Sequence, residues 1–211
     1  PLTFDTVLGQ LQWQLADERL LLQSSPLKLT ADHGPATVVL GLDIPFKAGA
    51  AQPPAMTLVV GLEDTAASYR DKFIPYVLNE EFLQWMKASV PRGHVKHGGF
   101  IYRGSLRQGD SDHRTGQLYL DVDQTTLNYH ADWPALTDIS GLVAIDDSRV
   151  TVRSSAANMF ELALPSTLVE VEPLAAGGMW LTVAANATGS AGDALRVVNE
   201  SAIQQLVGDV F

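Results

Sequence analysis

The sequence predicts a mainly β protein with an elongated, curved antiparallel β-sheet (a β-groove of repeating meanders) and about two short amphipathic helices. Many short segments alternate apolar with polar residues, which is the pattern of a strand with one apolar and one polar face. Turn-forming residues separate these segments at short intervals. Two stretches carry a helical period instead. These three observations define the fold class.

Residues 1–75 are predicted to form a first β-meander. We expect its strands at 6–15, 18–23, 26–31, 35–44 and 56–62. Asp17-Glu18 and Gly34-Pro35 are typical of the turns between them. The stretch from Lys47 to Pro54 is predicted to be a long hairpin tip or a loop, because Gly, Ala and Pro dominate it.

The strongest helical pattern follows Asn79 and predicts a helix over 80–90. Asn79 is a favourable N-cap, and two glutamates follow it in the first turn, where the helix dipole favours negative charge. Apolar residues that include Trp85 and Met86 recur at the spacing of one helix face. Pro91 is expected to end the helix.

Residues 76–211 are predicted to hold this helix, a second β-meander and a terminal helix, and to continue one groove with the first segment. We expect strands at 94–103, 116–123, 125–130, 140–146, 149–154, 158–164, 167–172 and 178–186. Asp193 is a candidate N-cap for a helix over 194–207 that Gly208 would end.

Composition excludes several classes of protein. The 211 residues carry a net charge of −10, which argues against nucleic acid as a partner, because binding it needs clustered Lys and Arg. With no Cys, the chain has neither disulfides nor thiolate ligands. We expect no signal peptide within this piece, which shows no charged region followed by an apolar run, and it has no apolar run of bilayer length. Because it starts at Pro1 without an initiator Met, we expect it to be a piece of a longer protein.

Residues capable of catalysis or metal binding lack the spacing that such sites need. His94 and His97 lie three apart in a predicted strand and so point to opposite faces, and solvated side chains are the simpler interpretation. Asp146-Asp147 is more simply a turn than a carboxylate pair. No nucleophile elbow, phosphate loop or dinucleotide fingerprint occurs. We therefore predict no catalytic residue, no metal site and no cofactor.

Two groups of residues within 76–165 resemble a known family. The first group combines a Trp in the predicted helix, a Gly-x-Val strand entry and an Arg-Gly turn. The second combines a Tyr, a Trp-Pro pair and a strand-opening Gly in order. These residues are Trp85, Arg103, Gly104, Tyr129, Trp133, Pro134 and Gly141. They are similar to the YhdP type of AsmA-like proteins of Gram-negative bacteria.

The resemblance implies lipid transport. Proteins of this type resemble long β-grooves that are anchored in the inner membrane, cross the periplasm and are thought to move phospholipid in outer-membrane biogenesis. This chain is then expected to be an internal periplasmic section, with phospholipid acyl chains and neighbouring segments of the same parent chain as partners. Membrane contact is expected only through parts of the parent outside this segment. Residues 107–112 are polar where the family tends to have a Phe-Pro-Phe-like stretch, so any ligand contact that those aromatics make in the family is missing or moved here.

Apolar residues of one parity are the candidate lining of such a groove. They are Val38, Leu40, Leu42, Leu58, Val60, Leu62, Leu118, Leu120 and Val122. Acyl chains would lie on this lining and headgroups would stay in water, since hiding one methylene from water contributes roughly 0.8 kcal/mol. The sequence leaves open which of these strands face the groove and which face a helix.

The alternative is a non-catalytic structural or interaction module with a closed β core and no lipid ligand. Its sequence would show the same alternation, with the apolar face covered by protein. The two predicted helices could supply part of that cover. A large exposed apolar patch would favour the conduit instead.

Overall fold

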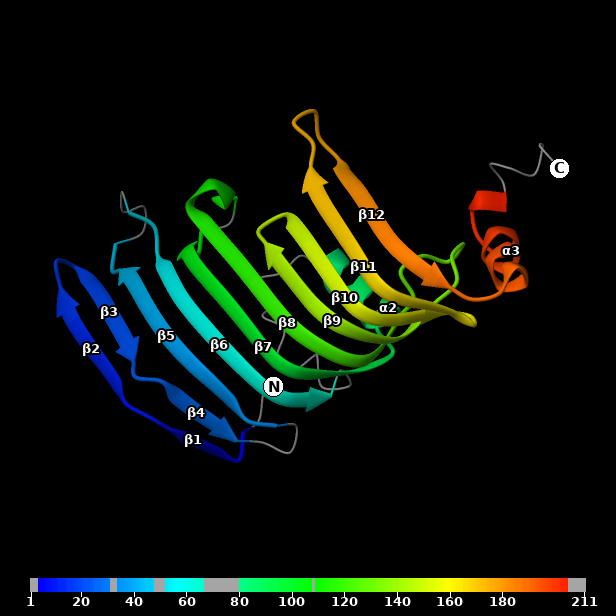
Figure 1. Cartoon of the computed structure of the whole chain (residues 1–211). Coiled ribbons are helices and arrows are strands. Elements are labelled where there is room, and N and C mark those ends of the chain that lie inside the picture. Colours follow the sequence, from blue (N-terminus) through cyan, green and yellow to red (C-terminus); the bar gives the residue numbers. More distant parts are fainter. Residues whose placement is uncertain (1–3, 31–33, 48–51, 67–79, 108, 205–211) are drawn as a thin grey trace. The chain divides into compact units, whose positions relative to one another are not determined.

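The computed structural model describes residues 4–30, 34–47, 52–66, 80–107 and 109–204 (Figure 1). Its helices are α2 (Glu80–Ser89), α3 (Ala191–Asn199) and a 3-10 turn at Ser111–His113. The strands are β1 (Thr6–Leu8), β2 (Leu11–Ala16), β3 (Arg19–Ser24), β4 (Leu27–Thr30), β5 (Ala36–Pro45), β6 (Ala55–Ala66), β7 (Arg92–Ser105), β8 (Arg114–Leu127), β9 (Leu136–Asp146), β10 (Arg149–Met159), β11 (Leu162–Pro173) and β12 (Met179–Thr188).

These strands pair into one open antiparallel sheet of 12 strands in the described part of the chain. The order is β1-β4-β5-β6-β7-β8-β9-β10-β11-β12, and β3 pairs with both β2 and β5. From β5 to β12 every neighbour in the sheet is also the next strand in sequence, which is the predicted meander. The predicted fold class is confirmed: the chain is mainly β, its sheet is open, and two short helices accompany it.

The chain divides into two compact units. Unit 1 comprises residues 1–65, 96–120 and 144–149, and unit 2 comprises residues 66–95, 121–143 and 150–211. Strands β7, β8 and β9 therefore contribute several residues to each unit, and β6 and β10 each contribute one terminal residue to the other unit. The boundary predicted between residues 75 and 76 lies outside the described residues, as does the predicted N-cap Asn79.

Unit 1 is built on the β5–β6 pair. Leu40 lies opposite Leu58 in this ladder, and β3 and β4 share the other edge of β5. The β2–β3 hairpin turns at Asp17 and Glu18, whose φ angles of 49° and 59° are both in the left-handed region. Two such residues in succession define the tight hairpin turn whose twist matches that of the strands. The turn fixes Ala16 opposite Arg19 and so sets the register of the hairpin.

Unit 2 contains the buried apolar cluster of the described residues. Ile139, Ala157 and Leu164 form it, and Leu127, Leu136 and Met159 pack against it.

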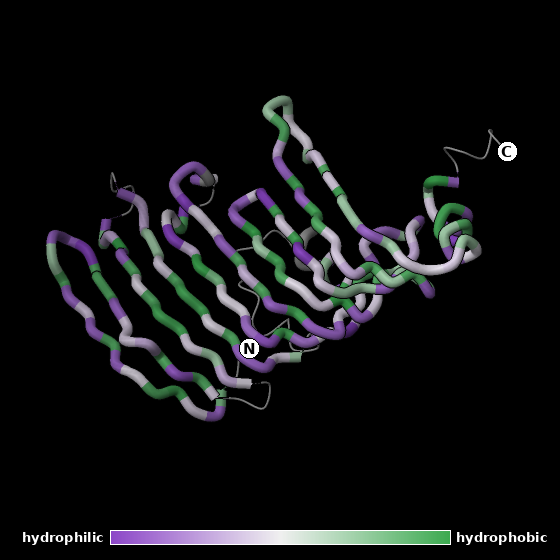
Figure 2. The backbone as a smooth tube through the Cα atoms, in the orientation of Figure 1, coloured by the Kyte–Doolittle hydropathy of each residue, from purple (hydrophilic) through white to green (hydrophobic). Residues whose placement is uncertain are grey.

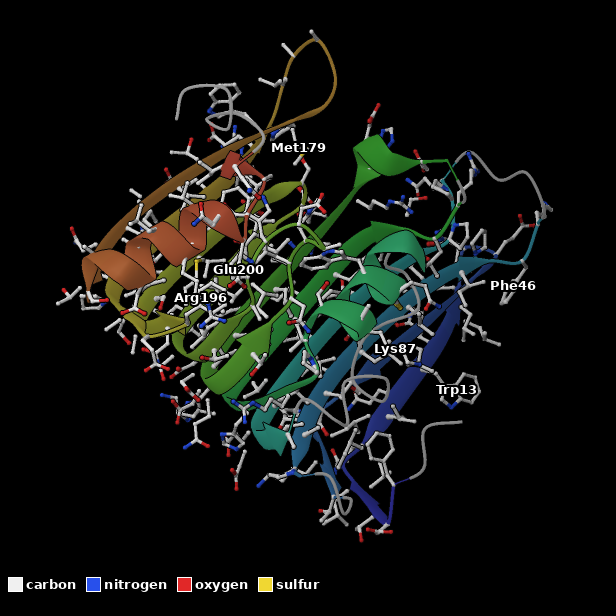
Figure 3. The ribbon with its side chains drawn as sticks, turned by 90° about the vertical axis from the view of Figure 1, so that its right-hand side faces the viewer. Trp13, Phe46, Lys87, Met179, Arg196 and Glu200 are labelled. Atoms are coloured by element: carbon white, nitrogen blue, oxygen red, sulfur yellow. The ribbon has the colours of Figure 1, made fainter. Side chains whose placement is uncertain are left out.

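Helix α3 lies beside the turn between β10 and β11, where the Arg196 guanidinium sits 3.9 Å from the centre of the Phe160 ring. The same guanidinium donates to Glu200, the C-cap residue of α3, at 2.8 Å, and both residues are labelled in Figure 3.

Three predicted strand divisions were wrong. The segment 6–15 contains two strands, β1 and β2, which pair with β4 and β3. The segments 116–123 and 125–130 belong to one strand, β8, because Gln124 enters the left-handed region (φ 46°) without ending the strand. The predicted strand 158–164 crosses a turn: β10 ends at Met159 and β11 begins at Leu162. Strand β11 also includes the predicted strand 167–172. The turn between β10 and β11 uses Phe160 at φ 53°, and a Phe at such a position is not a turn signal in sequence.

The bounds predicted for the terminal helix were wrong. Helix α3 covers Ala191–Asn199 rather than 194–207, and its N-cap is Ser190 rather than Asp193. The Ser190 hydroxyl accepts a hydrogen bond from the Asp193 backbone N–H at 3.1 Å. Asp193 thus lies in the first turn, where its negative charge still favours the helix dipole. Gly208, the predicted end, lies outside the described residues.

Gly141 in β9 allows β10 to approach closely. A Cβ atom at this position would lie 2.4 Å from the Arg153 carbonyl oxygen and 2.7 Å from the Ser154 Cα. Gly141→Ala is therefore expected to lower the free energy of unfolding by about 2 kcal/mol, measured by urea denaturation. Gly116→Ala is the matched control, because a Cβ there meets nothing within 4 Å. Equal stability of the two variants would show that β9 and β10 are not held at this distance.

Candidate functional site

The pairing register separates the side chains of β1–β6 into two faces. Residues directly opposite each other in a ladder point to the same face, and alternate residues of one strand share a face. Trp13 lies opposite Leu22, Leu22 opposite Leu42, and Leu42 opposite Met56. Val7, Leu29, Ala36 and Leu62 form a second such row. Figure 2 shows the resulting alternation of hydropathy along the strands.

Among the paired residues of these strands, one face is apolar with a single exception, Ser24. We call it the apolar face of unit 1. It consists of Val7, Leu11, Trp13, Leu15, Leu20, Leu22, Leu27, Leu29, Ala36, Val38, Leu40, Leu42, Ile44, Met56, Leu58, Val60 and Leu62. The Ser24 hydroxyl accepts a hydrogen bond from the Leu40 backbone N–H at 2.8 Å, so even this polar group is satisfied by the sheet.

The opposite face is largely polar, and we call it the polar face of unit 1. It consists of Thr6, Leu8, Gln12, Gln14, Ala16, Arg19, Leu21, Gln23, Lys28, Thr30, Thr37, Val39, Gly41, Asp43, Pro45, Ala55, Thr57, Val59, Gly61 and Glu63. All the charged residues of β1–β5 lie here, and Arg19 pairs with Asp43 at 2.5 Å. The contrast between the faces is that of a sheet with water on one side only.

The apolar face is open. Val7, Leu11, Trp13 and Leu15 are 56%, 59%, 69% and 58% exposed, and the Trp13 side chain stands clear of the ribbon in Figure 3. Among the described residues of β1–β6, Ala36 is the one apolar residue that is fully buried. Soluble monomers rarely leave so large a contiguous apolar surface without a ligand or a partner. The face is therefore the candidate functional site.

The structure brings six of the nine predicted lining residues onto this face. Val38 pairs with Val60, Leu40 with Leu58, and Leu42 and Leu62 lie on the same side of the ladder. Leu118 and Leu120 alternate along the unit 1 part of β8 and are half-buried, whereas Val122 is buried in unit 2. Sequence reasoning omitted the contributions of β1–β4, although the alternation of Leu11, Trp13 and Leu15 already indicated them.

Unit 2 carries an apolar face of its own on β10–β12. Val150, Val171 and Leu181 form one row across the three strands, and Val152, Val169 and Val183 form the next. Leu181 and Val183 are 60% and 58% exposed. Glu170 lies in the rows of the other face, between Thr151 and Thr182. The separation of apolar from polar side chains found in unit 1 therefore recurs here.

An open hollow of about 560 Å³ lies in unit 1 among β5–β9. Its apolar side chains include Val39 and Val59, which belong to the polar face, together with Ile101 and Tyr119. Gly61 and Gly99 also line it, and a Cβ at Gly99 would meet nothing within 4 Å. Sequence reasoning missed this hollow, because no local pattern shows that two glycines of different strands lie near each other.

The Arg103-Gly104 pair lies where β7 meets the beginning of β8. Gly104 has a φ of 131°, and a Cβ there would overlap the His113 carbonyl oxygen, so only Gly fits. Gly104 borders a polar cavity of about 430 Å³ that also contains Arg19, Arg107 and Asp110. Hydrogen bonds from Ser105 and His113 hold the pKa of Asp110 below its ordinary value.

The loop between β8 and β9 contains Tyr129, Trp133 and Pro134 and joins several parts of unit 2. Asn128 donates its backbone N–H to the Ser89 carbonyl at 2.7 Å, and Trp85 donates its indole N–H to the Tyr129 carbonyl at 3.4 Å. Both bonds tie the loop to α2. On the other side, the Ala202 N–H donates to the Asp132 carbonyl at 3.0 Å. The loop thus connects α2 with the segment that follows α3.

The aromatic residues of this loop pack on each other. The centres of the Tyr129 and Trp133 rings lie 6.1 Å apart, and Pro134 beside them is buried. Burial also raises the pKa of the Tyr129 hydroxyl. Apart from Arg103 and Gly104, the residues that carry the family resemblance therefore organise unit 2. They support the sheet rather than line either apolar face.

Comparison with known proteins agrees with these features. The family described as YhdP protein matches residues 1–211. The chain belongs to the YhdP family. Membership makes it a protein of the AsmA-like lipid transport type of the Gram-negative envelope, a family known for lipid transport rather than for catalysis. No curated protein and no solved structure matches the chain.

Chemistry other than apolar binding has little support in the part of this YhdP-family chain that the structure describes. No group of three or more His, Asp or Glu side chains with the geometry of a metal site occurs there. None of the described helices has both the length and the apolar character needed to cross a membrane. The site that stands out is the apolar sheet face, whose chemistry is the burial of hydrocarbon.

Trp133→Ala is expected to loosen unit 2. Removal of the half-buried indole should lower the free energy of unfolding by about 2 kcal/mol. Hydrogen exchange should speed up at the amides of Asn128 and Ala202, which hold the loop to its neighbours. Trp13→Ala is the control, since Trp13 is 69% exposed and its loss should leave stability nearly unchanged. Unchanged exchange at both amides in Trp133→Ala would contradict the bracing role of the loop.

Proposed function

We propose that this chain is an internal section of a periplasmic, bridge-like lipid transport protein. The apolar faces carry the acyl chains of phospholipid between the inner and outer membranes, while the headgroups remain in water. The parent protein is anchored in the inner membrane through a part outside this segment. Transport along the section is passive, and no residue of it acts as a catalyst.

The observation that carries the proposal is the open apolar face of unit 1. A closed structural module would bury the large side chains of such a face, yet Leu11, Trp13 and Leu15 are more than half exposed. Family membership supplies the ligand class, because YhdP proteins belong to the lipid transport type. The two observations are independent, since one rests on strand register and the other on sequence similarity.

The face suits a ligand that must be held and also move. Each methylene hidden from water contributes roughly 0.8 kcal/mol, so an acyl chain with a dozen of them on the face is bound strongly. The face offers no charged group and only one hydroxyl, Ser24, which the Leu40 backbone already engages. A chain that slides along the face therefore exchanges one hydrocarbon contact for another, with little change in free energy at each step.

The dimensions of the face are also adequate. Strand β6 has 12 residues, which at about 3.3 Å per residue gives a length near 40 Å. Adjacent strands lie about 4.8 Å apart, so the four strand positions from β2 to β6 give a width of roughly 14 Å. Several acyl chains can lie side by side on such a surface.

The edges of the sheet support continuation into neighbouring segments of the parent chain. Strands β1 and β2 at one edge and β12 at the other contain no charged residue, whereas every strand between them contains at least one. Isolated edge strands are usually protected by charges that prevent pairing. Edges without such protection are suited to receive a further strand, and a continued sheet would extend both apolar faces.

Substitution of one cross-strand pair on each face tests the proposal. Leu40→Asn with Leu58→Asn places two amides on the apolar face, and Val39→Asn with Val59→Asn places them on the opposite face of the same two strands. We expect the first double variant to carry about tenfold less co-purified phospholipid than the unsubstituted chain. The second should carry the same amount. Native mass spectrometry and lipid extraction measure both, and circular dichroism checks that each variant keeps its strands.

Two results would contradict the proposal. An unsubstituted chain that carries no phospholipid and takes none from vesicles would favour the ligand-free structural module. Loss of phospholipid in the Val39/Val59 variant alone would move the binding site to the hollow that Val39 and Val59 line.

A further inference from the structure

The tip of the β11–β12 hairpin combines exposure with an absence of charge. Leu174, Met179 and Trp180 are 46%, 51% and 60% exposed. No charged residue occurs between Glu172 and Asp193, in a chain in which 18% of residues are charged. Figure 1 shows the two strands and the turn that joins them, and Figure 2 shows that the turn is apolar. We define the hairpin tip as residues 173–180.

We propose that this hairpin tip inserts into the interfacial region of a lipid bilayer. The expectation from sequence resemblance was that membrane contact lies only outside this segment, and the proposal departs from it. Insertion of the tip does not require transport along the apolar faces, so it stands apart from the function proposed above.

Two backbone hydrogen bonds within the tip satisfy part of its polar backbone. Leu174 donates its N–H to the Gly178 carbonyl at 3.0 Å, and Gly177 donates its N–H to the Leu174 carbonyl at 2.9 Å. Polar backbone groups that enter hydrocarbon must be satisfied internally. Gly177 and Gly178 both have a φ of 88°, which lets the chain reverse within these few residues.

The charges of β11 limit the depth of insertion. Glu172 lies opposite Trp180, one row below the Pro173–Met179 pair. At about 3.3 Å per residue, the part beyond Glu172 extends no more than roughly 10 Å, which is the depth of interfacial rather than transmembrane insertion. Trp180 would then lie at the boundary between hydrocarbon and headgroups, where Trp is favoured.

The same charges select the kind of bilayer. Glu170 and Glu172 lie beside the tip on β11, no Lys or Arg lies within it, and the whole chain has a net charge of −10. An anionic surface would repel such a hairpin, so its fitting partner is a zwitterionic one. Strand β12 leads directly from the tip to Leu181 and Val183 on the apolar face of unit 2. If the proposed transport function holds, an inserted tip would bring that apolar face next to the bilayer, where acyl chains could pass between them.

Flotation with vesicles tests the insertion. The probes are vesicles of phosphatidylcholine, and vesicles of phosphatidylcholine mixed with phosphatidylglycerol. The unsubstituted chain should float with the first and less with the second. Leu174→Asp with Met179→Asp should lower the floated fraction on phosphatidylcholine about tenfold, because two apolar contacts are lost and two charges must stay hydrated. Leu195→Asp on α3 is the control, since Leu195 is 63% exposed and lies outside the tip.

Fluorescence locates the contact. Brominated phosphatidylcholine should quench part of the Trp emission of the chain, and that quenched part should disappear in Trp180→Phe. A chain that floats with neither kind of vesicle overturns the proposal and leaves the tip as a contact for protein. Equal flotation of the tip variant and the Leu195 control also overturns it. Because the tip variant should still carry co-purified phospholipid, failure here is distinguishable from failure of the transport function.

Discussion

Strand register is the constraint on which the rest of this structure depends. Side chains alternate with a period of two, so a slip of one residue between β5 and β6 would turn one strand's leucines into the polar face. With the observed register, apolar residues from six strands form one surface. The left-handed turn at Asp17-Glu18 fixes this register in one hairpin. Lys47 supports that turn through its ammonium, which pairs with the Glu18 carboxylate at 2.6 Å.

The same register leaves unit 1 with an apolar face that its own described strands do not cover. Such a surface is costly in water, and its cost falls when something apolar covers it. Unit 2 differs, because it buries a small apolar cluster around Ile139. Its β8–β9 loop is held by hydrogen bonds to α2 and to the segment after α3. Its β10–β12 strands nevertheless repeat the open apolar face. Unit 2 thus combines a buried cluster with an open apolar face.

Much of this organisation could be predicted from sequence, because alternation is a local signal. Val38, Leu40 and Leu42 show it within five residues, and their placement on one face follows from strand geometry alone. The family was also recognisable, from the Trp-Pro pair and its neighbours. Pairing across distance could not be predicted: β4 bonds to β1 on one side and to β5 on the other, and no local pattern indicates this. Phe160 gave no sign of the turn, because a Phe does not signal a left-handed backbone, and the break predicted at Gln124 is a local irregularity inside one strand.

The most direct test of the central claim compares two adjacent residues of β6. Leu58 belongs to the apolar face and Val59 to the polar face, so a photoreactive benzoylphenylalanine at each position samples opposite sides of one strand. Irradiation of the parent protein in cells, followed by mass spectrometry, detects phospholipid attached at either site. The account predicts phospholipid adducts at position 58 and few at position 59. Adducts at 59 in equal or greater number, or none at 58, would contradict it.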